Sequence, residues 1–459
     1  MNFPAGFLEQ LTGVAGFSKD AFVEVHARGP AVISVRLNPN KPLSSFPPAS
    51  LTIPGAISSD LKTTPIPWCD SGFYLSERPS FTFDPLFHAG TYYVQEASSM
   101  FLEQAMKQSV DLSSPVKVLD LCAAPGGKST HLQSLISKES MLVSNEVIRA
   151  RSFILRDNMI KWGAENVIVT NNDPKDFSVL EGCFDVVVAD APCSGSGLFR
   201  KEPEAMEEWS ENNVQLCAQR QQRILADILP ALKNGGVLIY STCSYSKDED
   251  EAISSWLTNE HAMQPLRITI KPEWGLIESE AGYRFWPDRV KGEGFYLACF
   301  RKTTGKENHK LKSAKPIRLA GQAAVTAVKS WMKTEGKKLI MHETTVYAWP
   351  EKSVPDFQLL LEKFRVVYSG VRVGELIRDK LVPEHSLAMS TCLADHLVKT
   401  ELNLDQAIAF LQKKEFDPES RQKGWQLAIY EGFPLGWMNV LPNRFNNYYP
   451  KELRILKEK

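Results

Sequence analysis

Short apolar runs alternate with longer amphipathic stretches through the middle of the chain. The apolar runs predict strands at 116–121, 141–145, 166–170, 184–190 and 236–241. Amphipathic stretches between them, such as 147–162, predict helices. Because strands that alternate with helices form a parallel sheet covered on both faces, we expect an α/β domain over residues 91–302. Two later runs, near 283–287 and 294–300, predict an antiparallel edge.

The two ends of the chain have a different pattern. Residues 1–90 carry many prolines between short apolar runs, which is typical of small strands and turns on a compact N-terminal subdomain. Residues 301–315 hold six Lys or Arg against one acid and almost no apolar side chains. They predict a linker, which we place at 303–315. Apolar and aromatic residues return over 316–459, and we expect this C-terminal region to fold separately.

Composition and charge narrow the class of protein. With 459 residues, 43% of them hydrophobic and 23% charged, the chain can bury a large core. No apolar run approaches the roughly 18 residues of a membrane span, and the N-terminus has no secretory pattern. We therefore expect a cytoplasmic protein without a membrane partner. A formal net charge of -1 excludes a uniformly basic coat but leaves room for a nucleic-acid binder with one basic face.

A loop of small residues follows the first predicted strand. The sequence CAAPGGKST (122–130) leads into a helix that we expect to begin near Ser129. Gly126 and Gly127 allow close approach of the backbone to a ligand, and free N–H groups at the helix start point toward it. Gly127-Lys128-Ser129 is also the ending of a phosphate-binding P-loop, but the first glycine of that motif would fall at Cys122. A nucleoside triphosphatase is therefore disfavoured.

Three acids follow the second, third and fourth predicted strands. They are Glu146, Asp173 and Asp190. Ligands of open α/β sheets bind at the carboxyl ends of the strands, and an acid there can accept hydrogen bonds from the ribose hydroxyls of an adenosine ligand. The alternative is that each acid is a solvated or helix-capping carboxylate. Three acids placed alike favour a nucleoside cofactor.

Two cysteines follow the fourth and fifth predicted strands, in DAPCSGSG (190–197) and YSTCSYSKDEDE (240–251). If these strands are adjacent, Cys193 and Cys243 face one crevice with the cofactor. Lys128 and the helix N-termini would favour ionisation of a thiol there. A structural pair, a redox pair and metal ligands are alternatives, but the eight cysteines have no C-x-x-C spacing. We therefore expect free thiols and no metal site.

These motifs together resemble the Sun-type (nucleolar protein) RNA cytosine-C5 methyltransferases. LDLCAAPGGKS, Glu146, Asp173, DAPCSG, RKEP (200–203) and STCS occur in the order of that family, and SVRLNPNK (34–41) and YVQEASSM (93–100) agree as well. The likeness covers about residues 30–302. It implies a Rossmann-like S-adenosylmethionine methyltransferase domain with a small N-terminal RNA-binding subdomain. The implied cofactor-binding residues are Cys122, Ala123, Ala124, Pro125, Gly126, Gly127, Lys128, Glu146, Asp173 and Asp190.

The resemblance also implies how the thiols act. Carbon 5 of cytosine becomes nucleophilic when a thiolate adds to carbon 6, so this chemistry needs a covalent thiol catalyst. By likeness to the family, Cys243 is the nucleophile and Cys193 assists release of the methylated base, with Asp190 and Lys128 completing the catalytic set. DNA cytosine methyltransferases instead use the position of Cys193. The residues alone leave that choice open, and the family likeness decides it.

The C-terminal segment PLGWMNVLPNRFNNYYPKELR (434–454) resembles the tail of the methyltransferase F branch, which acts on bacterial small-subunit ribosomal RNA. It implies an α+β extension with a PUA-like RNA-binding domain, and 16S ribosomal RNA, free or within a small-subunit particle, as the partner. We expect a monomer, because nothing in the sequence demands more. Transfer RNA is an alternative substrate. A small-molecule methyltransferase or a non-catalytic RNA-binding assembly factor is an alternative function.

Candidate RNA contacts are spread over the three regions, because extruding a stacked base requires compensating contacts in the pocket and along the backbone. Cations mixed with stackable rings suit RNA loops and ends. The alternative is that the rings are packing residues and the cations form a solvated face. The candidates are Arg36, Asn38, Lys41, Arg200, Lys201, Arg444, Tyr448, Tyr449, Lys451 and Arg454.

Overall fold

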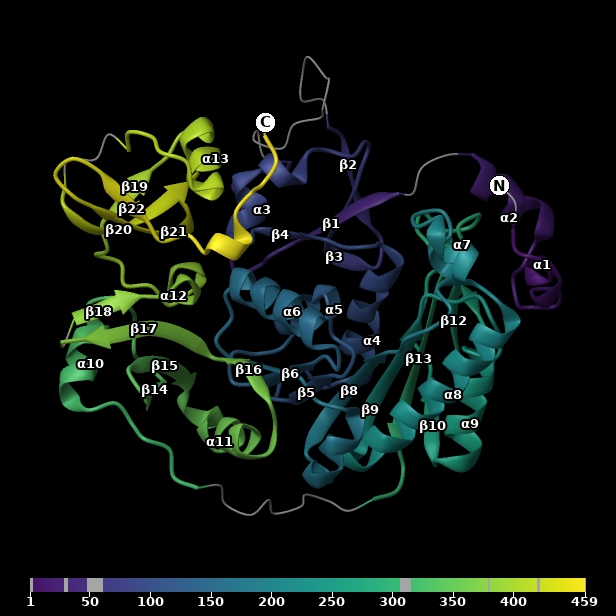
Figure 1. The fold of residues 1–459 in the computed structure, drawn as a ribbon. Coiled ribbons are helices and arrows are strands. Elements are labelled where there is room, and N and C mark those ends of the chain that lie inside the picture. Colours follow the sequence, from purple (N-terminus) through teal and green to yellow (C-terminus); the bar gives the residue numbers. More distant parts are fainter. Residues whose placement is uncertain are drawn as a thin grey trace.

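A ten-stranded mixed sheet forms the centre of the molecule (Figure 1). The structure is a computed structural model that describes residues 3–28, 32–47, 61–305, 315–378, 380–418 and 422–458. The strand order is β11-β12-β13-β9-β8-β5-β6-β7-β16, with β10 paired to β13. The parallel strands are β5 (Lys117–Asp120), β6 (Met141–Asn145), β7 (Val167–Thr170), β8 (Phe184–Asp190) and β9 (Leu232–Thr242). All five strands predicted from the apolar runs are thus confirmed.

Antiparallel strands extend this sheet at both edges. On one side β13 pairs with β9 and β12 with β13, which confirms the predicted antiparallel edge. On the other side β16 pairs with β7. The antiparallel strands are β10 (Met263–Leu266), β11 (Ile277–Glu278), β12 (Gly282–Phe285), β13 (Phe295–Lys302) and β16 (Val366–Ser369).

Helices cover both faces of the sheet because each strand alternates its apolar side chains between them. Val118 faces one buried cluster and Leu119 the other. The first face is covered by α4 (Leu102–Ser109), α5 (Gly127–Leu135) and α6 (Arg149–Trp162). The second is covered by α8 (Glu211–Ile228), α9 (Glu251–Glu260) and α11 (Val354–Lys363). Among the described residues, no helix is long and apolar enough to cross a bilayer.

The N-terminal region contains a four-stranded sheet and, apart from it, two helices. The sheet has the order β2 (Thr63–Ile66), β3 (Cys69–Leu75), β1 (Ile33–Leu37) and β4 (Tyr92–Val94), with α3 (Pro85–Ala89) beside it. A boundary at residue 90 is therefore wrong, because β4 completes this sheet. The helices α1 (Phe7–Gln10) and α2 (Lys19–Ala27) instead pack near α7 (Glu204–Glu208), as Figure 1 shows.

The C-terminal region contains two further four-stranded sheets. The first comprises β14 (Lys337–His342), β15 (Thr345–Pro350), β17 (Val371–Ile377) and β18 (Lys380–Pro383), and α10 (Gln322–Lys329) and α12 (His385–Met389) accompany it. The second comprises β19 (Lys399–Glu401), β20 (Gly424–Tyr430), β21 (Phe433–Val440) and β22 (Phe445–Asn447), together with α13 (Leu404–Gln412). Most of the predicted linker, residues 306–314, lies outside the described residues.

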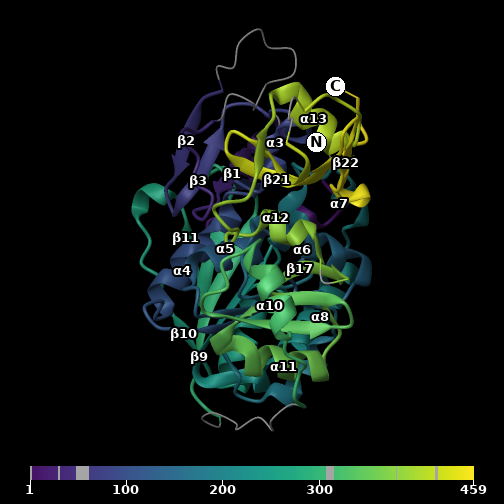
Figure 2. The same cartoon turned by 90° about the vertical axis from the view of Figure 1, so that its left-hand side faces the viewer.

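The C-terminal region does not fold separately, contrary to the prediction from its composition. It contributes β16 to the central sheet, and Phe357 and Leu360 of α11 are buried against that sheet. Its last sheet packs on the N-terminal sheet through one apolar cluster that joins Leu435 and Phe410 to Leu86. Figure 2 shows α13 and β21 beside α3. The C-terminal region therefore contacts both the central sheet and the N-terminal sheet.

Candidate active site

The loop that follows β5 forms one wall of a cavity of about 160 Å³. The cavity is lined by Cys122, Ala123, Ala124, Pro125, Gly127, Lys128, Asp190 and part of the segment 93–99. Gly126 has φ +115°, and a Cβ there would lie 3.3 Å from Leu155 Cδ1, so this position requires glycine. The helix α5 starts at Gly127, two residues before the predicted start near Ser129, and its first residues, Gly127 and Lys128, line the cavity.

Glu146 lies at the end of β6 with only 3% of its surface exposed. Its Oε1 accepts the backbone N–H of Ile148 at 2.8 Å, and Arg151 lies 3.7 Å from its Oε2. Asp173 is more exposed, accepts the N–H of Lys175 and pairs with Arg223 at 3.3 Å. Asp173 thus caps the short helix after β7, which is the alternative role weighed for it. Of the three predicted acids Glu146, Asp173 and Asp190, only Glu146 has a carboxylate held nearly out of solvent.

Asp120 is a buried acid directly before the loop 122–128. The motifs in the sequence did not single it out. It ends β5, and its Oδ2 accepts the hydroxyl of Ser129 at 2.6 Å. Burial, with a smaller contribution from the nearby carboxylate of Asp190, raises its pKa to about 7. An acid inside the apolar run VKVLDL was the available signal. Asp120 fixes the start of α5 from below and adds a titrating group to the site.

Lys128 and Asp190 form an ion pair, with 2.8 Å between Nζ and Oδ2. Ser241 donates its hydroxyl to Asp190 Oδ1 at 2.7 Å, which fixes the carboxylate. Burial has the largest effect and lowers the pKa of Lys128, but the charge and hydrogen bond of Asp190 together with the charge of Asp120 outweigh it, so the net shift is upward. Lys128 is therefore a permanent cation, and it lies close enough to Cys243 to interact with it electrostatically.

The two predicted thiols meet at the carboxyl ends of β8 and β9. These strands are adjacent and parallel, with Asp190 opposite Ser241. The Sγ atoms of Cys193 and Cys243 are 3.2 Å apart, and both cysteines are free and partly exposed. The pKa of Cys193 is raised well above its ordinary value. The hydrogen bond to Cys243 is the largest cause and burial is the second. Cys193 is thus held as a protonated thiol beside the second sulfur.

The prediction that Arg36 contacts RNA is wrong in this structure, because its side chain is completely buried. Its guanidinium donates to Gln95 Oε1 at 2.9 Å and to Thr130 Oγ1 at 2.7 Å, and it reaches the carbonyl of Gly127 at 3.3 Å. Burial lowers its pKa to about 10. Arg36 connects β1 to the first turn of α5 and so supports the loop 122–128.

Asn38 and Lys41 are buried for a related reason, and their predicted RNA contacts are wrong as well. Asn38 donates to the carbonyls of Gly90 and Trp162 at 2.9 and 3.0 Å. Lys41 Nζ donates to two main-chain carbonyls, each at 2.8 Å. Burial lowers the pKa of Lys41 to about 7. Both side chains satisfy main-chain acceptors where the N-terminal region meets α6.

The other RNA candidates divide by exposure. Tyr449 is 4% exposed and packs on Phe410, so its predicted RNA contact is wrong. The Arg200 side chain is 6% exposed and pairs with Glu293 at 3.1 Å. The exposed candidates are Lys201, Arg444, Tyr448 and Lys451, and Arg454 is half-buried.

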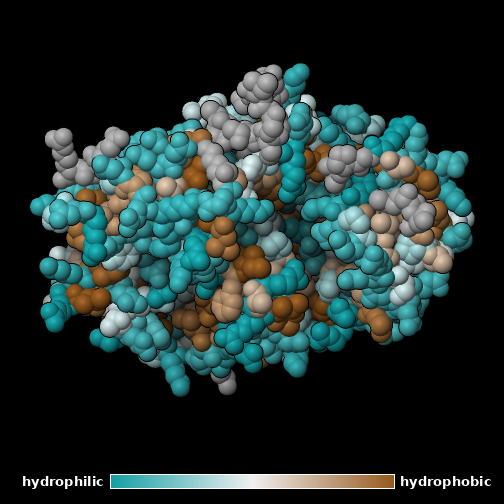
Figure 3. Space-filling model, turned by 45° about the horizontal axis from the view of Figure 1, so that its top comes forward, coloured by the Kyte–Doolittle hydropathy of each residue, from teal (hydrophilic) through white to brown (hydrophobic). Residues whose placement is uncertain are grey.

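A groove of about 690 Å³ adjoins the cofactor cavity, with which it shares Val94, Gln95 and Glu96. Its floor includes apolar residues of β1, β3 and β4, and its cations are Arg78, Arg200, Lys201 and Lys291. Arg78 and Lys291 were missed because they come from separate segments that only the fold brings together. Figure 3 shows one face of the molecule, hollowed near its centre with hydrophobic side chains beside the hollow.

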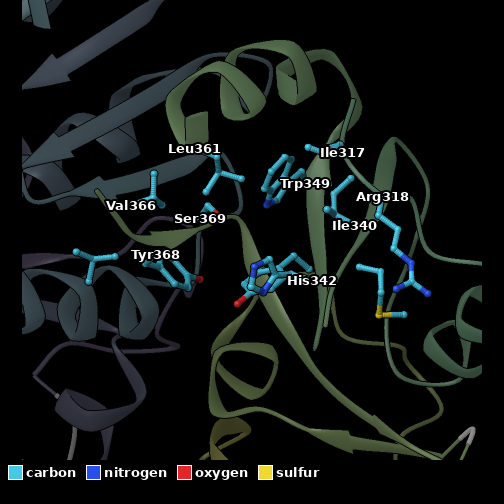
Figure 4. A pocket seen from close by; sticks show the side chains of 12 residues that line it. Ile317, Arg318, Ile340, His342, Trp349, Leu361, Val366, Tyr368 and Ser369 are labelled. Carbon is cyan, nitrogen blue, oxygen red and sulfur yellow. The ribbon is translucent and has the colours of Figure 1, made fainter. Parts of the chain in front are cut away.

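Another cavity, of about 470 Å³, lies within the C-terminal region, away from the thiols (Figure 4). Its walls include Ile340, Trp349, Leu361 and Tyr368, with Arg318 at one side. None of the predicted site residues lines it. It forms where β16 leaves the C-terminal region to join the central sheet.

One buried group of possible metal ligands occurs among the described residues, formed by Cys69, Glu103 and His131. Glu103 Oε2 lies 3.1 Å from His131 Nε2, and its Oε1 lies 2.6 Å from Lys107 Nζ. The carboxylate is therefore already occupied by hydrogen-bond donors, and the group is a buried polar network between β3, α4 and α5.

Three family models match successive parts of the chain. Residues 3–97 match the N-terminal domain of 16S rRNA methyltransferase RsmF, 108–301 match 16S rRNA methyltransferase RsmB/F, and 398–455 match the methyltransferase RsmF PUA domain. The match over 398–455 coincides with the last sheet of the structure. The fold class expected from the sequence is confirmed by these matches.

Similar proteins carry related names. The ribosomal RNA small subunit methyltransferase F of Aliivibrio fischeri (strain ATCC 700601 / ES114) is 31% identical, with 85% of each chain covered. That of Serratia proteamaculans (strain 568) is 29% identical over 98% of this chain and 96% of its own.

Two solved structures have similar folds. PH0851 is 26% identical with a TM-score of 0.57, covering 65% of this chain and 66% of its own. NSun6 from Pyrococcus horikoshii, solved with SFG, shares the fold at 18% identity and a TM-score of 0.53, covering 66% of this chain and 99% of its own. The motifs, the fold and these matches agree, and the chain belongs to the RsmB/F family of 16S rRNA methyltransferases.

Proposed function

We propose that this protein transfers a methyl group from S-adenosylmethionine to carbon 5 of a cytosine in small-subunit (16S) ribosomal RNA, with Cys243 as the nucleophile. The observation that carries the proposal is the thiol pair. Covalent activation of a pyrimidine requires one thiolate, and here a free sulfur lies near the charged Lys128 with a second sulfur 3.2 Å away to assist release. The family and the names of the relatives favour ribosomal RNA.

The residues around the small cavity fit the proposed cofactor. Glu146 is a nearly buried acid at the end of β6, suited to the ribose hydroxyls of an adenosine. The loop 122–128 offers its backbone and the start of α5, and the carboxylate of Asp190 places negative charge near a cationic sulfonium. When bound, S-adenosylmethionine supplies an electrophilic methyl group. We also assign Asp173 to cofactor binding, which requires its carboxylate to leave the ion pair with Arg223.

The thiols divide the reaction between them. The Cys243 thiolate adds to carbon 6, which turns carbon 5 into an enamine-like nucleophile that takes the methyl group. Carbon 5 then loses its proton to solvent, the C6–S bond breaks, and the electron pair of that bond returns to the Cys243 sulfur. Cys193, protonated and 3.2 Å away, donates a hydrogen bond to the departing sulfur. Attack and release thus use different sulfurs.

The RNA is held in the groove next to the cofactor cavity. Extruding the target base costs a few kcal/mol, which backbone contacts offset. Arg78, Lys201 and Lys291 provide cations along this groove. Exposed Arg444, Tyr448 and Lys451 extend the surface onto the PUA domain. We assign the protein to the cytoplasm, as a monomer that acts on RNA alone or within a small-subunit particle.

Two alternatives lead to different results in one experiment. Purified protein is incubated with labelled S-adenosylmethionine and either 16S ribosomal RNA, small subunits or transfer RNA, and the products are mapped by bisulfite sequencing. We expect 5-methylcytosine in the ribosomal RNA, and none with Cys243→Ser. Methylation of transfer RNA alone would replace the substrate. If wild type and the Cys243 variant bind RNA equally well and none of the three substrates is methylated, the protein would instead be an assembly factor.

A further inference from the structure

The two loops that carry the thiols are joined by one buried carboxylate. Each cysteine is followed by a serine, Ser194 after Cys193 and Ser244 after Cys243. Glu249 accepts the backbone N–H of Ser194 at 2.7 Å and its hydroxyl at 2.6 Å. It also accepts the hydroxyl of Ser244 at 2.6 Å. The carboxylate therefore touches the residue next to each sulfur.

Glu249 is well placed to hold a fixed geometry. It is fully buried between the end of β9 and the start of α9. Its main-chain carbonyl accepts the hydroxyl of Tyr240, which anchors the residue to β9. Burial raises the pKa of its carboxyl group. The three hydrogen bonds from Ser194 and Ser244 lower this pKa, but by less than burial raises it. Among the described residues, the hydrogen bonds that its carboxylate accepts all come from the serines that follow the two cysteines.

The loops have a second connection that does not depend on Glu249. The N–H of Gly197 donates to the carbonyl of Cys243 at 2.8 Å, and the N–H of Tyr245 donates to Ser196 Oγ at 3.0 Å. Loss of the carboxylate therefore leaves both loops attached to one another. What it removes is the constraint immediately behind the sulfurs.

We propose that Glu249 is a positioning residue that sets the distance between the two thiols and so couples attack by Cys243 to release assisted by Cys193. This inference rests on the proposed function. Two of its three bonds go to the residue after Cys193, so removing the carboxylate displaces the releasing thiol more than the attacking one. Attack then continues while release slows.

The distinguishing result is a covalent protein–RNA adduct formed with both cysteines present. We compare Glu249→Gln, Ser194→Ala and Ser244→Ala with Cys193→Ala, using 16S ribosomal RNA and S-adenosylmethionine and separating the adduct on denaturing gels. We expect Glu249→Gln to accumulate adduct, with kcat lowered about ten- to hundredfold and KM for RNA little changed. Ser194→Ala shows the same effect more weakly, and Ser244→Ala shows less adduct than Ser194→Ala.

Asp248→Asn is the matched control, because it neutralises the neighbouring acid on the same loop. The main-chain N–H of Asp248 bonds to Ser246, and its carboxylate joins neither serine, so wild-type turnover is expected. Thermal melting checks that Glu249→Gln remains folded.

Different outcomes would contradict the positioning role of Glu249 and the proposed roles of Cys193 and Cys243. Turnover without adduct in Glu249→Gln, or parallel loss of kcat, adduct and melting temperature, would overturn the positioning role. Absence of adduct in Cys193→Ala itself would overturn the proposed division of labour between the thiols, on which the inference rests.

Discussion

At the scale of single residues, the buried carboxyl group of Asp120, next to the loop 122–128, makes the stability of the fold depend on pH. Asp120 is completely buried, and its Oδ1 has no hydrogen-bond partner among the described residues. A carboxyl group in such a place favours its neutral form, which is why burial raises its pKa to about 7. The same group is ordinary in the unfolded chain, so folding and proton binding are linked.

The substitution Asp120→Asn tests this linkage. Between about pH 4 and 7 the folded protein binds the Asp120 proton more tightly than the unfolded chain, so wild-type stability falls as pH rises through that range. The amide keeps an acceptor for Ser129 and removes the titration. We measure the free energy of unfolding of both proteins by urea titration. We expect the value for the variant minus the value for wild type to increase from about pH 4 to 7 and to stay constant above about pH 7. Parallel curves over the whole range would show that Asp120 does not titrate there.

At the scale of elements, the sequence could predict each strand that carries an apolar run, but not the strand that joins from afar. β5 to β9 follow from apolar runs bounded by polar residues, and the meeting of Cys193 and Cys243 follows from the adjacency of β8 and β9. β16 (Val366–Ser369) was missed because its partner β7 lies far away in sequence. Pairing of that kind depends on the whole fold.

Gly370 marks the point where β16 turns into β17. It has φ +57°, its N–H donates to Val167 of β7 at 2.9 Å, and a Cβ would lie 2.5 Å from the carbonyl oxygen of Ala348. Gly370→Ala should therefore destabilise the protein by strain and by a steric clash. Gly336→Ala is the control, since Gly336 has φ +68° and open space around it.

In urea unfolding, we expect a loss of about 1 to 2 kcal/mol for Gly336→Ala, from the left-handed backbone alone. Gly370→Ala should lose clearly more, because the clash involves main-chain atoms. Equal losses for the two variants would mean that the turn relaxes and that the junction of β16 with the central sheet is not rigid.

At the scale of the whole molecule, the groove that we propose as the RNA-binding surface is assembled from segments distant in sequence. The basic motif SVRLNPNK suggested RNA contacts, yet its Arg36, Asn38 and Lys41 are buried where the N-terminal sheet meets the central domain. Sequence reveals the charge of a residue but not which side of its strand is covered. Arg78 and Lys291, which carry no motif, line the groove instead.

Charge reversal in this groove should weaken RNA binding. Lys291 lies over the ring of Tyr74 at 4.6 Å, with Arg78 on the same groove. We expect Arg78→Glu and Lys291→Glu each to raise the Kd for 16S ribosomal RNA, and to lower the slope of log K against log salt by about 0.7 for each phosphate that is no longer neutralised. Lys329→Glu, an exposed lysine on α10, is the matched control. Equal effects of all three changes would point to net charge rather than to the groove.

The covalent role of Cys243 is tested most directly by identifying the atom that holds the RNA. Cys193→Ala is incubated with 16S ribosomal RNA and S-adenosylmethionine, the trapped complex is digested with protease and nuclease, and the cross-linked peptide is sequenced by mass spectrometry. A methylated cytidine attached at Cys243 is the predicted result. Attachment at any other residue, or methylated RNA released at the wild-type rate without a cross-linked peptide, would contradict the assigned mechanism.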